Sequence, residues 1–375
     1  MELAFAILLL LYLVLLALVR IRWTKIPVQV IKEDTDEPPG VSVIIPARNE
    51  ESNIKQLVDS LNGLVYPRHK LEIVIVDDSS DDHTLLKLRQ HVVEGSCIKW
   101  LALEESPFFQ SSYKKRALTC GIEASKFPII VTSDADCQFQ PLWINSLVNA
   151  ITSNNWIMVS APVVYRKTGF LVSMLEIELA CLVAVGAVSL QAGKPNMCNG
   201  ANLAFTREAF VRVGGYQGFE HIASGDDEFL LYKMNLQFPG RIGFNKTIDS
   251  VVSTEPPVSF RELLNQRIRW GSKWKEHKSL TTKILPLLIF LFHLVFTVVF
   301  FMTLFGAYSW KVFIVQLLSK MLVEVWLLRS LFNFFGKTIK WKWFLLMQIL
   351  YSFYVVLVGV VVQFYGFSWK NRRYL

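Results

Sequence analysis

The sequence lacks the patterns that identify several common functional classes. Its five cysteines form no CxxC pair and no His-linked spacing, and they are Cys97, Cys120, Cys137, Cys181 and Cys198. This distribution favours reduced thiols over a zinc site or a disulfide framework. Neither the P-loop pattern GxxxxGK(S/T) nor a glycine-rich GxGxxG turn occurs. A bound nucleotide would therefore need a metal ion and side chains to hold its phosphates.

An excess of acidic residues is also missing, since 39 Lys and Arg outnumber 31 Asp and Glu and give a net charge of +8. Part of this charge comes from lysines and arginines that flank long apolar runs. We therefore attribute it to a membrane surface and predict no nucleic-acid partner.

Apolar residues are abundant instead. They make up 52% of the chain, the mean hydropathy is +0.36, and the excess lies towards the two ends. Leu3 to Val19 is a run of 17 uncharged residues, about 26 Å long as a helix. A cleaved signal peptide is the alternative, but the positive charges follow the run and no small-x-small cleavage site is visible. The sequence predicts an uncleaved anchor with its N-terminus outside.

Three further apolar runs lie near the C-terminus, at Ile284–Phe305, Val312–Leu331 and Trp343–Phe364. The middle run contains Lys320 and Glu324, which can pair along one helix face. We interpret it as a helix packed against its neighbours, with a substrate path as the alternative. The predicted domains are an anchor (1–22), a cytoplasmic catalytic domain (23–283) and about three transmembrane helices (284–375).

The direction of the C-terminal spans stays open. Basic residues on both sides of the last run favour the cytoplasm, and they are Lys337, Lys340 and Lys342 before it and Lys370, Arg372 and Arg373 after it. Either one span is re-entrant or interfacial, or the tail breaks the positive-inside rule.

In the middle of the chain, apolar strands alternate with helical patterns. Such alternation predicts a mostly parallel sheet with helices on both faces. The expected strands are 41–45, 72–76, 98–103 and 129–132, and the expected helices are 52–61, 83–91 and 114–125.

Ligands of such sheets lie beyond the carboxyl ends of the strands. Five acidic residues follow the second and fourth strands, and they are Asp77, Asp78, Asp81, Asp134 and Asp136. Clustered carboxylates are unfavourable unless a cation satisfies them, and Mg²⁺ and Mn²⁺ prefer oxygen ligands together with substrate phosphates. Basic candidates for the phosphates are Lys114, Lys115, Arg116, Arg267 and Arg269.

Three later stretches have two interpretations each. SGDDEFLL (224–231) opens an apolar helix, where acidic residues also suit the helix N-terminus. FRELLNQRIRWGSKW (260–274) is either part of the site or a basic amphipathic helix on the membrane surface, and both can hold. Residues 170–192 form either a core helix or a helix in the bilayer interface, and we favour the interface.

In order, the motifs VSVIIPARNEE, EIVIVDDSSDD, KKRAL, SDADC, NGANLAF, GDDEFLL and QRIRW resemble the family 2 glycosyltransferases. They are most similar to the membrane-embedded branch that includes cellulose, hyaluronan and chitin synthases and ceramide glucosyltransferase. The resemblance covers roughly residues 38 to 280. It implies a GT-A type nucleotide-sugar-binding domain joined to transmembrane helices.

The resemblance also implies roles for individual residues. The predicted nucleotide-sugar ligands are Glu50, Asp77, Asp78, Lys114, Asp134, Arg269 and Trp270. Asp136 would bind Mg²⁺ or Mn²⁺, and Gln266 and Arg267 would face the acceptor or the diphosphate. Asp227 is the expected catalytic base, although Asp226 beside it leaves an ambiguity of one residue. Thr119 departs from the family pattern, in which asparagine is frequent at that position.

The predicted function is transfer of a sugar, with inversion, from a UDP-sugar to a lipid or lipid-linked acceptor. Alternatives are a processive polysaccharide synthase, which would extend a growing glycan, and a catalytically silent subunit of glycan export. A nucleotidyltransferase would also use paired carboxylates but would not explain QRIRW beside a membrane span. The expected location is a bacterial inner membrane, with the catalytic domain in the cytoplasm. Donor sugar, linkage and oligomeric state are not predicted.

Overall fold

The protein is described by a computed structural model covering residues 2–31, 37–104, 112–167, 169–220, 222, 224–273, 280–369 and 372–374. It consists of two compact units, each built from separate stretches of the chain. We call them the helical unit (Met1–Ile26, Lys167–Val188 and Pro257–Leu375) and the sheet unit (Pro27–Arg166 and Ser189–Pro256). The predicted domain limits of 1–22, 23–283 and 284–375 stay predictions.

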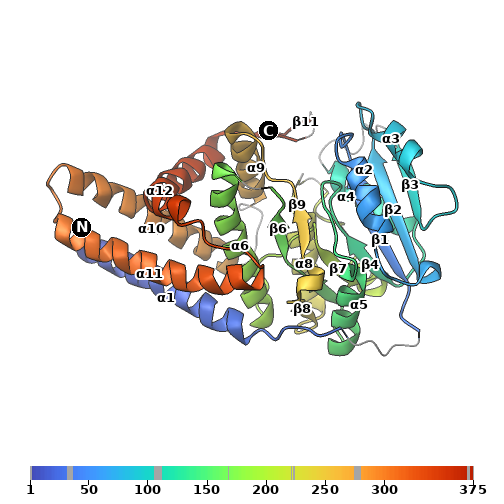
Figure 1. Ribbon diagram of the computed structural model, residues 1–375, viewed down its shortest axis with the longest axis horizontal. Coiled ribbons are helices and arrows are strands. Elements are labelled where there is room, and N and C mark those ends of the chain that lie inside the picture. Colours follow the sequence, from blue (N-terminus) through green and yellow to red (C-terminus); the bar gives the residue numbers. More distant parts are fainter. Residues whose placement is uncertain are drawn as a thin grey trace. The chain divides into compact units, whose positions relative to one another are not determined.

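A seven-stranded sheet in the order β3-β2-β1-β4-β7-β5-β8 forms the centre of the sheet unit (Figure 1). Strands β3, β2, β1 and β4 are parallel, as are β5 and β8, whereas β7 is antiparallel to β4 and β5. A separate parallel pair joins β6 to β9. The strands are β1 (Val41–Ala47), β2 (Leu71–Asp78), β3 (Ile98–Leu103), β4 (Ile129–Thr132), β5 (Met158–Ser160), β6 (Val163–Tyr165), β7 (Leu203–Thr206), β8 (Ile242–Phe244) and β9 (Val252–Thr254).

Helices cover both faces of this sheet because successive strand side chains point to opposite faces. Val43 and Ile45 of β1 belong to the same buried cluster as Leu57 of α2. The intervening Ile44 lies on the other face, against Gly121 of α4. The helices of this unit are α2 (Ile54–Asn62), α3 (Thr84–His91), α4 (Tyr113–Glu123), α5 (Trp143–Asn154), α7 (Arg207–Arg212) and α8 (Asp226–Gln237), with short 3-10 turns at Arg68–Lys70 and Ile248–Ser250. The predicted fold class is confirmed.

The second strand is longer than the sequence indicated. We predicted 72–76, with Asp77 and Asp78 in the turn after it, but β2 continues to Asp78. The cause is its pairing with β3, in which Asp77 lies opposite Ala102 and Asp78 opposite Leu103. Both carboxylates therefore belong to the end of the strand.

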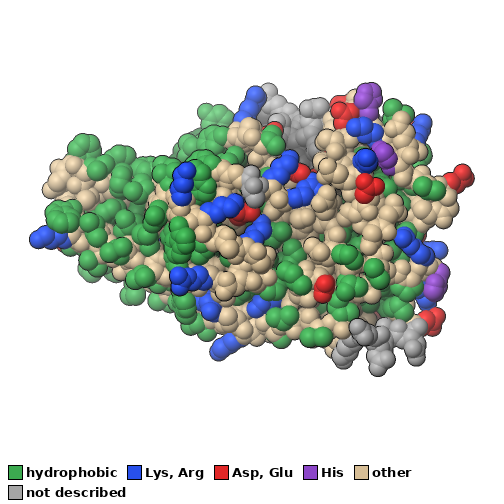
Figure 2. All heavy atoms as spheres, viewed as in Figure 1, with side chains coloured by type: hydrophobic (Ala, Val, Ile, Leu, Met, Phe, Trp, Pro, Cys, Tyr) green, Lys and Arg blue, Asp and Glu red, His purple; other side chains and the backbone are tan. Residues whose placement is uncertain are grey.

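The helical unit contains the long apolar helices. Among the described residues, four helices are long and apolar enough to cross a membrane: α1, α6, residues 283–304 of α10, and α12. Figure 2 shows mainly hydrophobic side chains over much of the narrow end of this unit. Its elements are α1 (Glu2–Lys25), α6 (Phe170–Gln191), α9 (Phe260–Ser272), α10 (Leu280–Leu304), α11 (Trp310–Phe334), α12 (Trp341–Phe364), β10 (Phe367–Trp369) and β11 (Arg372–Tyr374). Trp274 and Lys370, named in the sequence analysis, lie outside the described residues.

Helix α11 is not among these four, and its polar pair is satisfied inside the unit. Lys320 Nζ lies 2.8 Å from both Glu324 Oε1 and Gln348 Oε1. Glu324 also accepts hydrogen bonds from the Tyr12 hydroxyl (2.7 Å) and the Gln348 amide (2.9 Å). These contacts join α1, α11 and α12, as expected for a helix packed against its neighbours.

Candidate active site

The loops after β1 and β2 are bound to each other at the carboxyl edge of the sheet. Asn49 Oδ1 accepts a hydrogen bond from the Asp81 N–H, and the Asn49 N–H donates to Ser80 Oγ, both at 3.0 Å. Asn49 and Ser79 have φ values of 51° and 55°, which are uncommon for residues other than glycine. Such conformations concentrate at functional sites, where surrounding contacts hold them.

Arg48, one of the residues after the first strand, supports this loop pair. Its side chain is 6% exposed, and Nη1 donates to the carbonyl oxygens of Asp78 (2.6 Å) and Ser79 (2.5 Å). The sequence gives no signal for this role, because the partners are backbone atoms 30 and 31 residues away.

The predicted ligands at the ends of these two strands are buried. Glu50 accepts a hydrogen bond from Asn53 Nδ2 at 2.7 Å. Asp77 accepts one from Ser80 Oγ at 2.5 Å. Asp78 is 3% exposed, and its neighbour Asp77 equally so. The structure thus brings Glu50, Asp77 and Asp78 to one edge of the sheet.

Lys114, near the start of α4, connects two acidic groups that are far apart in sequence. Its Nζ lies 2.7 Å from Asp134 Oδ1 and 3.4 Å from Asp226 Oδ2. Burial alone would lower the pKa of Lys114, but the carboxylates of Asp134, Asp226 and Asp227 outweigh it and raise the pKa well above its ordinary value. Lys114 therefore carries a positive charge among three carboxylates.

The acidic residues of GDDEFLL occupy the first turn of α8, as predicted. Gly225 precedes them with φ at 80°, a conformation that favours glycine. Asp227 Oδ2 accepts the Gly200 N–H at 2.9 Å, and Oδ1 accepts the Glu228 N–H at 2.8 Å. A Cβ atom at Gly200 would lie 3.2 Å from Asp226 Oδ2 and 3.3 Å from Asp227 Cβ. Backbone from the NGANLAF motif thus fixes the orientation of Asp227.

Asp134 and Asp136 follow β4, which ends at Thr132. Ser133 Oγ donates to the Ala201 carbonyl at 2.7 Å and ties this turn to the segment before β7. Among the described residues, no cluster of three His, Cys, Asp or Glu side chains could hold a metal ion. Two carboxylates with substrate phosphates are nevertheless a usual arrangement for Mg²⁺, so Asp134 and Asp136 fit a metal that the donor helps to bind.

The QxxRW residues lie on α9 of the helical unit, and Arg267 is engaged there. Its guanidinium lies 2.6 Å from Glu178 Oε2, 2.9 Å from the Tyr354 hydroxyl and 2.7 Å from Gln266 Oε1. It also lies 4.3 Å from the centre of the Trp270 ring. Arg267 thus links α9 to α6 and α12. The predicted roles of Gln266, Arg267, Arg269 and Trp270 at the donor or acceptor stay predictions.

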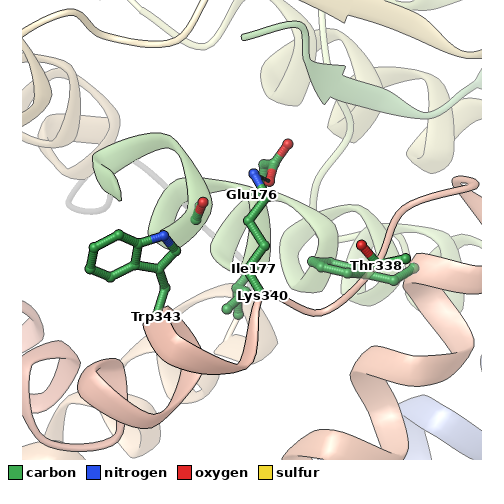
Figure 3. Close-up of a pocket in the computed structure, with 7 residues that line it drawn as sticks. Glu176, Ile177, Thr338, Lys340 and Trp343 are labelled. Carbon is green, nitrogen blue, oxygen red and sulfur yellow. Dashed lines mark ion pairs between the residues drawn. The ribbon is translucent and has the colours of Figure 1, made fainter. Parts of the chain in front are cut away.

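A small pocket in the helical unit lies among α6, α11, α12 and the segment between the last two (Figure 3). Glu176 on its wall lies 2.6 Å from Lys337 Nζ and 4.0 Å from Lys340 Nζ. None of the described residues that line this pocket is a predicted catalytic or donor-binding residue.

Comparison with known proteins finds a family match for part of the chain. Residues 42–212 match the family described as Glycosyl transferase family 2. Glycosyltransferase AglE of Haloferax volcanii is 27% identical over 240 residues, which are 63% of this chain and 73% of that protein. Dodecaprenyl-phosphate galacturonate synthase of Rhizobium johnstonii is 32% identical over 134 residues, which are 35% of this chain and 36% of that protein.

The fold comparison covers nearly the whole chain. The structure of mannosyltransferase PcManGT from Pyrobaculum calidifontis, in complex with GDP-Man and Mn²⁺, has a TM-score of 0.59 and 20% identity, and the match covers 96% of both chains. The GT-A fold and the predicted enzyme class, glycosyltransferase, are confirmed.

Proposed function

Since residues 42–212 are a glycosyl transferase family 2 domain, we propose that the protein is an inverting membrane glycosyltransferase. It would transfer a sugar from a UDP-sugar to a lipid or lipid-linked acceptor with the help of a divalent cation. The observation that carries this proposal is the junction of Lys114 with Asp134 and Asp226, which gathers the turn after β4 and the first turn of α8 around one ammonium group.

The donor would bind along the carboxyl edge of β1, β2 and β4. Glu50, Asp77 and Asp78 would contact the uridine part, because they lie buried at the ends of the two strands whose loops are bound to each other. Lys114 and Asp134 would contact the sugar diphosphate. Because Lys114 stays positively charged, it can donate charge-assisted hydrogen bonds to the diphosphate oxygens.

Asp136, with Asp134, would hold Mg²⁺ or Mn²⁺ together with the donor phosphates. When bound, such an ion neutralises the charge on the diphosphate and so makes it a better leaving group. Both side chains are carboxylates and supply oxygen ligands, the ligand type that Mg²⁺ and Mn²⁺ prefer.

Asp227 would act as the general base. It accepts the proton of the acceptor hydroxyl while that oxygen attacks the anomeric carbon from the face opposite the diphosphate. The new carbon–oxygen bond forms as the bond to the diphosphate breaks, and the leaving diphosphate takes the electron pair. This single displacement inverts the anomeric centre. Lys114 would stabilise the negative charge on the leaving group, and the QRIRW sequence makes Arg269 a further candidate for this role.

A lipid acceptor is supported by the apolar helices and by the likeness to a dodecaprenyl-phosphate galacturonate synthase. Helix α6 is long and apolar enough to enter a bilayer, as a protein that uses an acceptor from the membrane would require. The protein would be an integral protein of a bacterial inner membrane, with the sheet unit in the cytoplasm. A processive polysaccharide synthase is the second candidate, favoured by the QRIRW sequence.

The test is donor turnover by the full chain in lipid nanodiscs, followed as nucleotide release. A panel of UDP-sugars, with GDP-mannose for comparison, is offered with Mg²⁺, with Mn²⁺ and with a chelator. We expect release from a UDP-sugar that requires the metal and is lost in Asp227→Asn. No release from any donor would contradict the proposal and favour a silent subunit. Release from GDP-mannose alone would exclude the UDP donor.

A further inference from the structure

Lys115 follows the predicted phosphate ligand Lys114 directly but makes contacts of another kind. Its Nζ donates to three carbonyl oxygens, those of Phe219 (2.8 Å), Ile222 (2.5 Å) and Ser224 (3.3 Å). An ammonium group has three N–H donors, enough for these three carbonyl groups, and Nζ also lies 5.6 Å from the centre of the Phe229 ring. The residue is 3% exposed. Lys115 is therefore buried and directed at backbone, although the sequence placed it among the candidates for phosphate binding.

The three carbonyl groups belong to the segment between α7 and α8, close to the point where α8 begins at Asp226. Ser224 is followed by Gly225, whose left-handed conformation turns the chain into the helix that begins with Asp226. The Phe219 ring stacks on Phe229 of α8, with 4.3 Å between ring centres and 13° between planes. The segment is thus attached to α4 through Lys115 and to α8 through the two rings.

We propose that Lys115 is a positioning residue for Asp227. It fixes the approach to α8, and thereby the first turn that carries the carboxylate, without contacting the donor. This inference rests on the proposed function, in which Asp227 is the base. Adjacent lysines on α4 thus divide the work, with Lys114 at the carboxylates and Lys115 at the backbone behind them.

The physical reason is the convergence of three carbonyl oxygens on one buried point. Buried carbonyl groups without a donor are unfavourable. A side chain with no N–H at position 115 would leave the segment to rearrange until those oxygens found other partners. The movement would be transmitted to α8 through Ser224 and Gly225.

Lys233, a partly buried residue of α8, provides a control that binds an earlier part of the same segment. Its Nζ also donates to three carbonyl oxygens, those of Gly214 (3.3 Å), Gly215 (2.8 Å) and Gln217 (2.9 Å). These lie at the beginning of the segment, farther along the chain from Asp227. Lys115 and Lys233 thus share their chemistry and differ in the part of the segment that they hold.

The experiment is steady-state donor turnover by the full chain in lipid nanodiscs. Lys115→Met is expected to lower kcat by about 100-fold, the effect of small misplacements in an active site, while KM for the donor changes by less than about threefold. Lys115→Arg should recover much of kcat, and Lys233→Met should keep it within about threefold. A raised KM with unchanged kcat in Lys115→Met, or equal losses in both methionine variants, would overturn the inference.

Hydrogen exchange without donor separates this inference from the proposed function. In Lys115→Met the amides of residues 226–230 should exchange faster, with β1 and β2 unchanged. Unchanged exchange in α8 would overturn the inference. Faster exchange in a protein whose wild type turns over no donor would reject the proposed function and keep only the attachment of the first turn of α8 by Lys115. If Lys115→Met does not fold, Phe219→Leu should lower kcat at constant KM, and an unchanged kcat would overturn the inference.

Discussion

At the scale of single residues, Lys114 determines the charge balance of the site. Its pKa is raised by the carboxylates around it. In the unfolded chain the pKa of Lys114 is near 10.5, and in the folded protein it is higher. The contribution of charged Lys114 to the free energy of unfolding is therefore complete below pH 10.5, and it is lost only as pH rises through the higher folded pKa. Lys114→Met should therefore lower the unfolding temperature, relative to wild type, by the same amount at about pH 6 and at about pH 9. A loss that shrinks towards pH 9 would contradict this assignment.

The same substitution should be more severe for activity. Lys114→Met removes the positive charge that lies among the carboxylates of Asp134, Asp226 and Asp227. We expect kcat/KM for the donor to fall by about 100-fold or more. Nucleotide release gives the measurement. Lys126→Met is the control, because its ammonium lies 4.8 Å from the Phe127 ring centre and touches none of the site carboxylates in the described contacts. Comparable losses in both variants would contradict a specific role.

Residues that act through side chains could be found in the sequence, and residues that act on backbone could not. Asp134 was located because it follows a buried strand, and that reasoning needs only the strand pattern. Arg48 and Lys115 bind carbonyl groups of segments distant in the chain. Every residue has a backbone carbonyl group, so the sequence does not indicate which ones are bound. Gly200 is similar, since its contribution is an N–H group directed at Asp227.

At the scale of elements, the approach of α4 to the sheet depends on Gly121. A Cβ atom there would lie 2.5 Å from Ile44 Cγ2 and 2.9 Å from Val76 Cγ2. We expect Gly121→Ala to lower the free energy of unfolding by about 1–3 kcal/mol through overpacking. Gly63→Ala, whose Cβ would lie 3.4 Å from the Ser60 carbonyl oxygen, should change the free energy of unfolding little. Thermal unfolding is the measurement, and a more stable Gly121→Ala would show that helix propensity outweighs the clash.

Helix α11 depends on the hydrogen bonds of Glu324. Its removal would leave Lys320, which is 2% exposed, without its carboxylate. Breaking a buried pair in this way costs about 3–5 kcal/mol, so Glu324→Ala should unfold at a clearly lower temperature in detergent. Arg329→Ala, on the exposed face of the same helix, is the control. Equal unfolding temperatures in Glu324→Ala and wild type would refute this role.

Element limits were predictable only where the pattern was long. The expected limits of β1, α2 and α4 lie within about two residues of those observed. Strands β5 to β9 were not predicted, and each has only three or four residues, too few for alternation to show. Strand β4 is equally short, but its apolar run after a helical stretch was enough to predict it. The antiparallel insertion of β7 between β4 and β5 also depends on pairing that no local pattern encodes.

At the scale of the whole molecule, the chain combines a stretch that matches glycosyl transferase family 2 with a unit of apolar helices. The sequence predicted both parts from composition and motif order. It also offered a place at the membrane for residues 170–192 and 260–274, but gave no sign of the contact between Arg267 and Glu178 that joins α9 to α6 in the helical unit.

The most direct test of the account is the fate of a labelled sugar. Wild type and Asp227→Asn, in nanodiscs that contain native lipid and Mn²⁺, are given the UDP-sugar that supports turnover. The account predicts label in the organic-solvent extract for wild type and none above background for Asp227→Asn. Label retained as long polymer would reject the lipid acceptor in favour of a polysaccharide synthase. Equal transfer by both proteins would contradict the catalytic site itself.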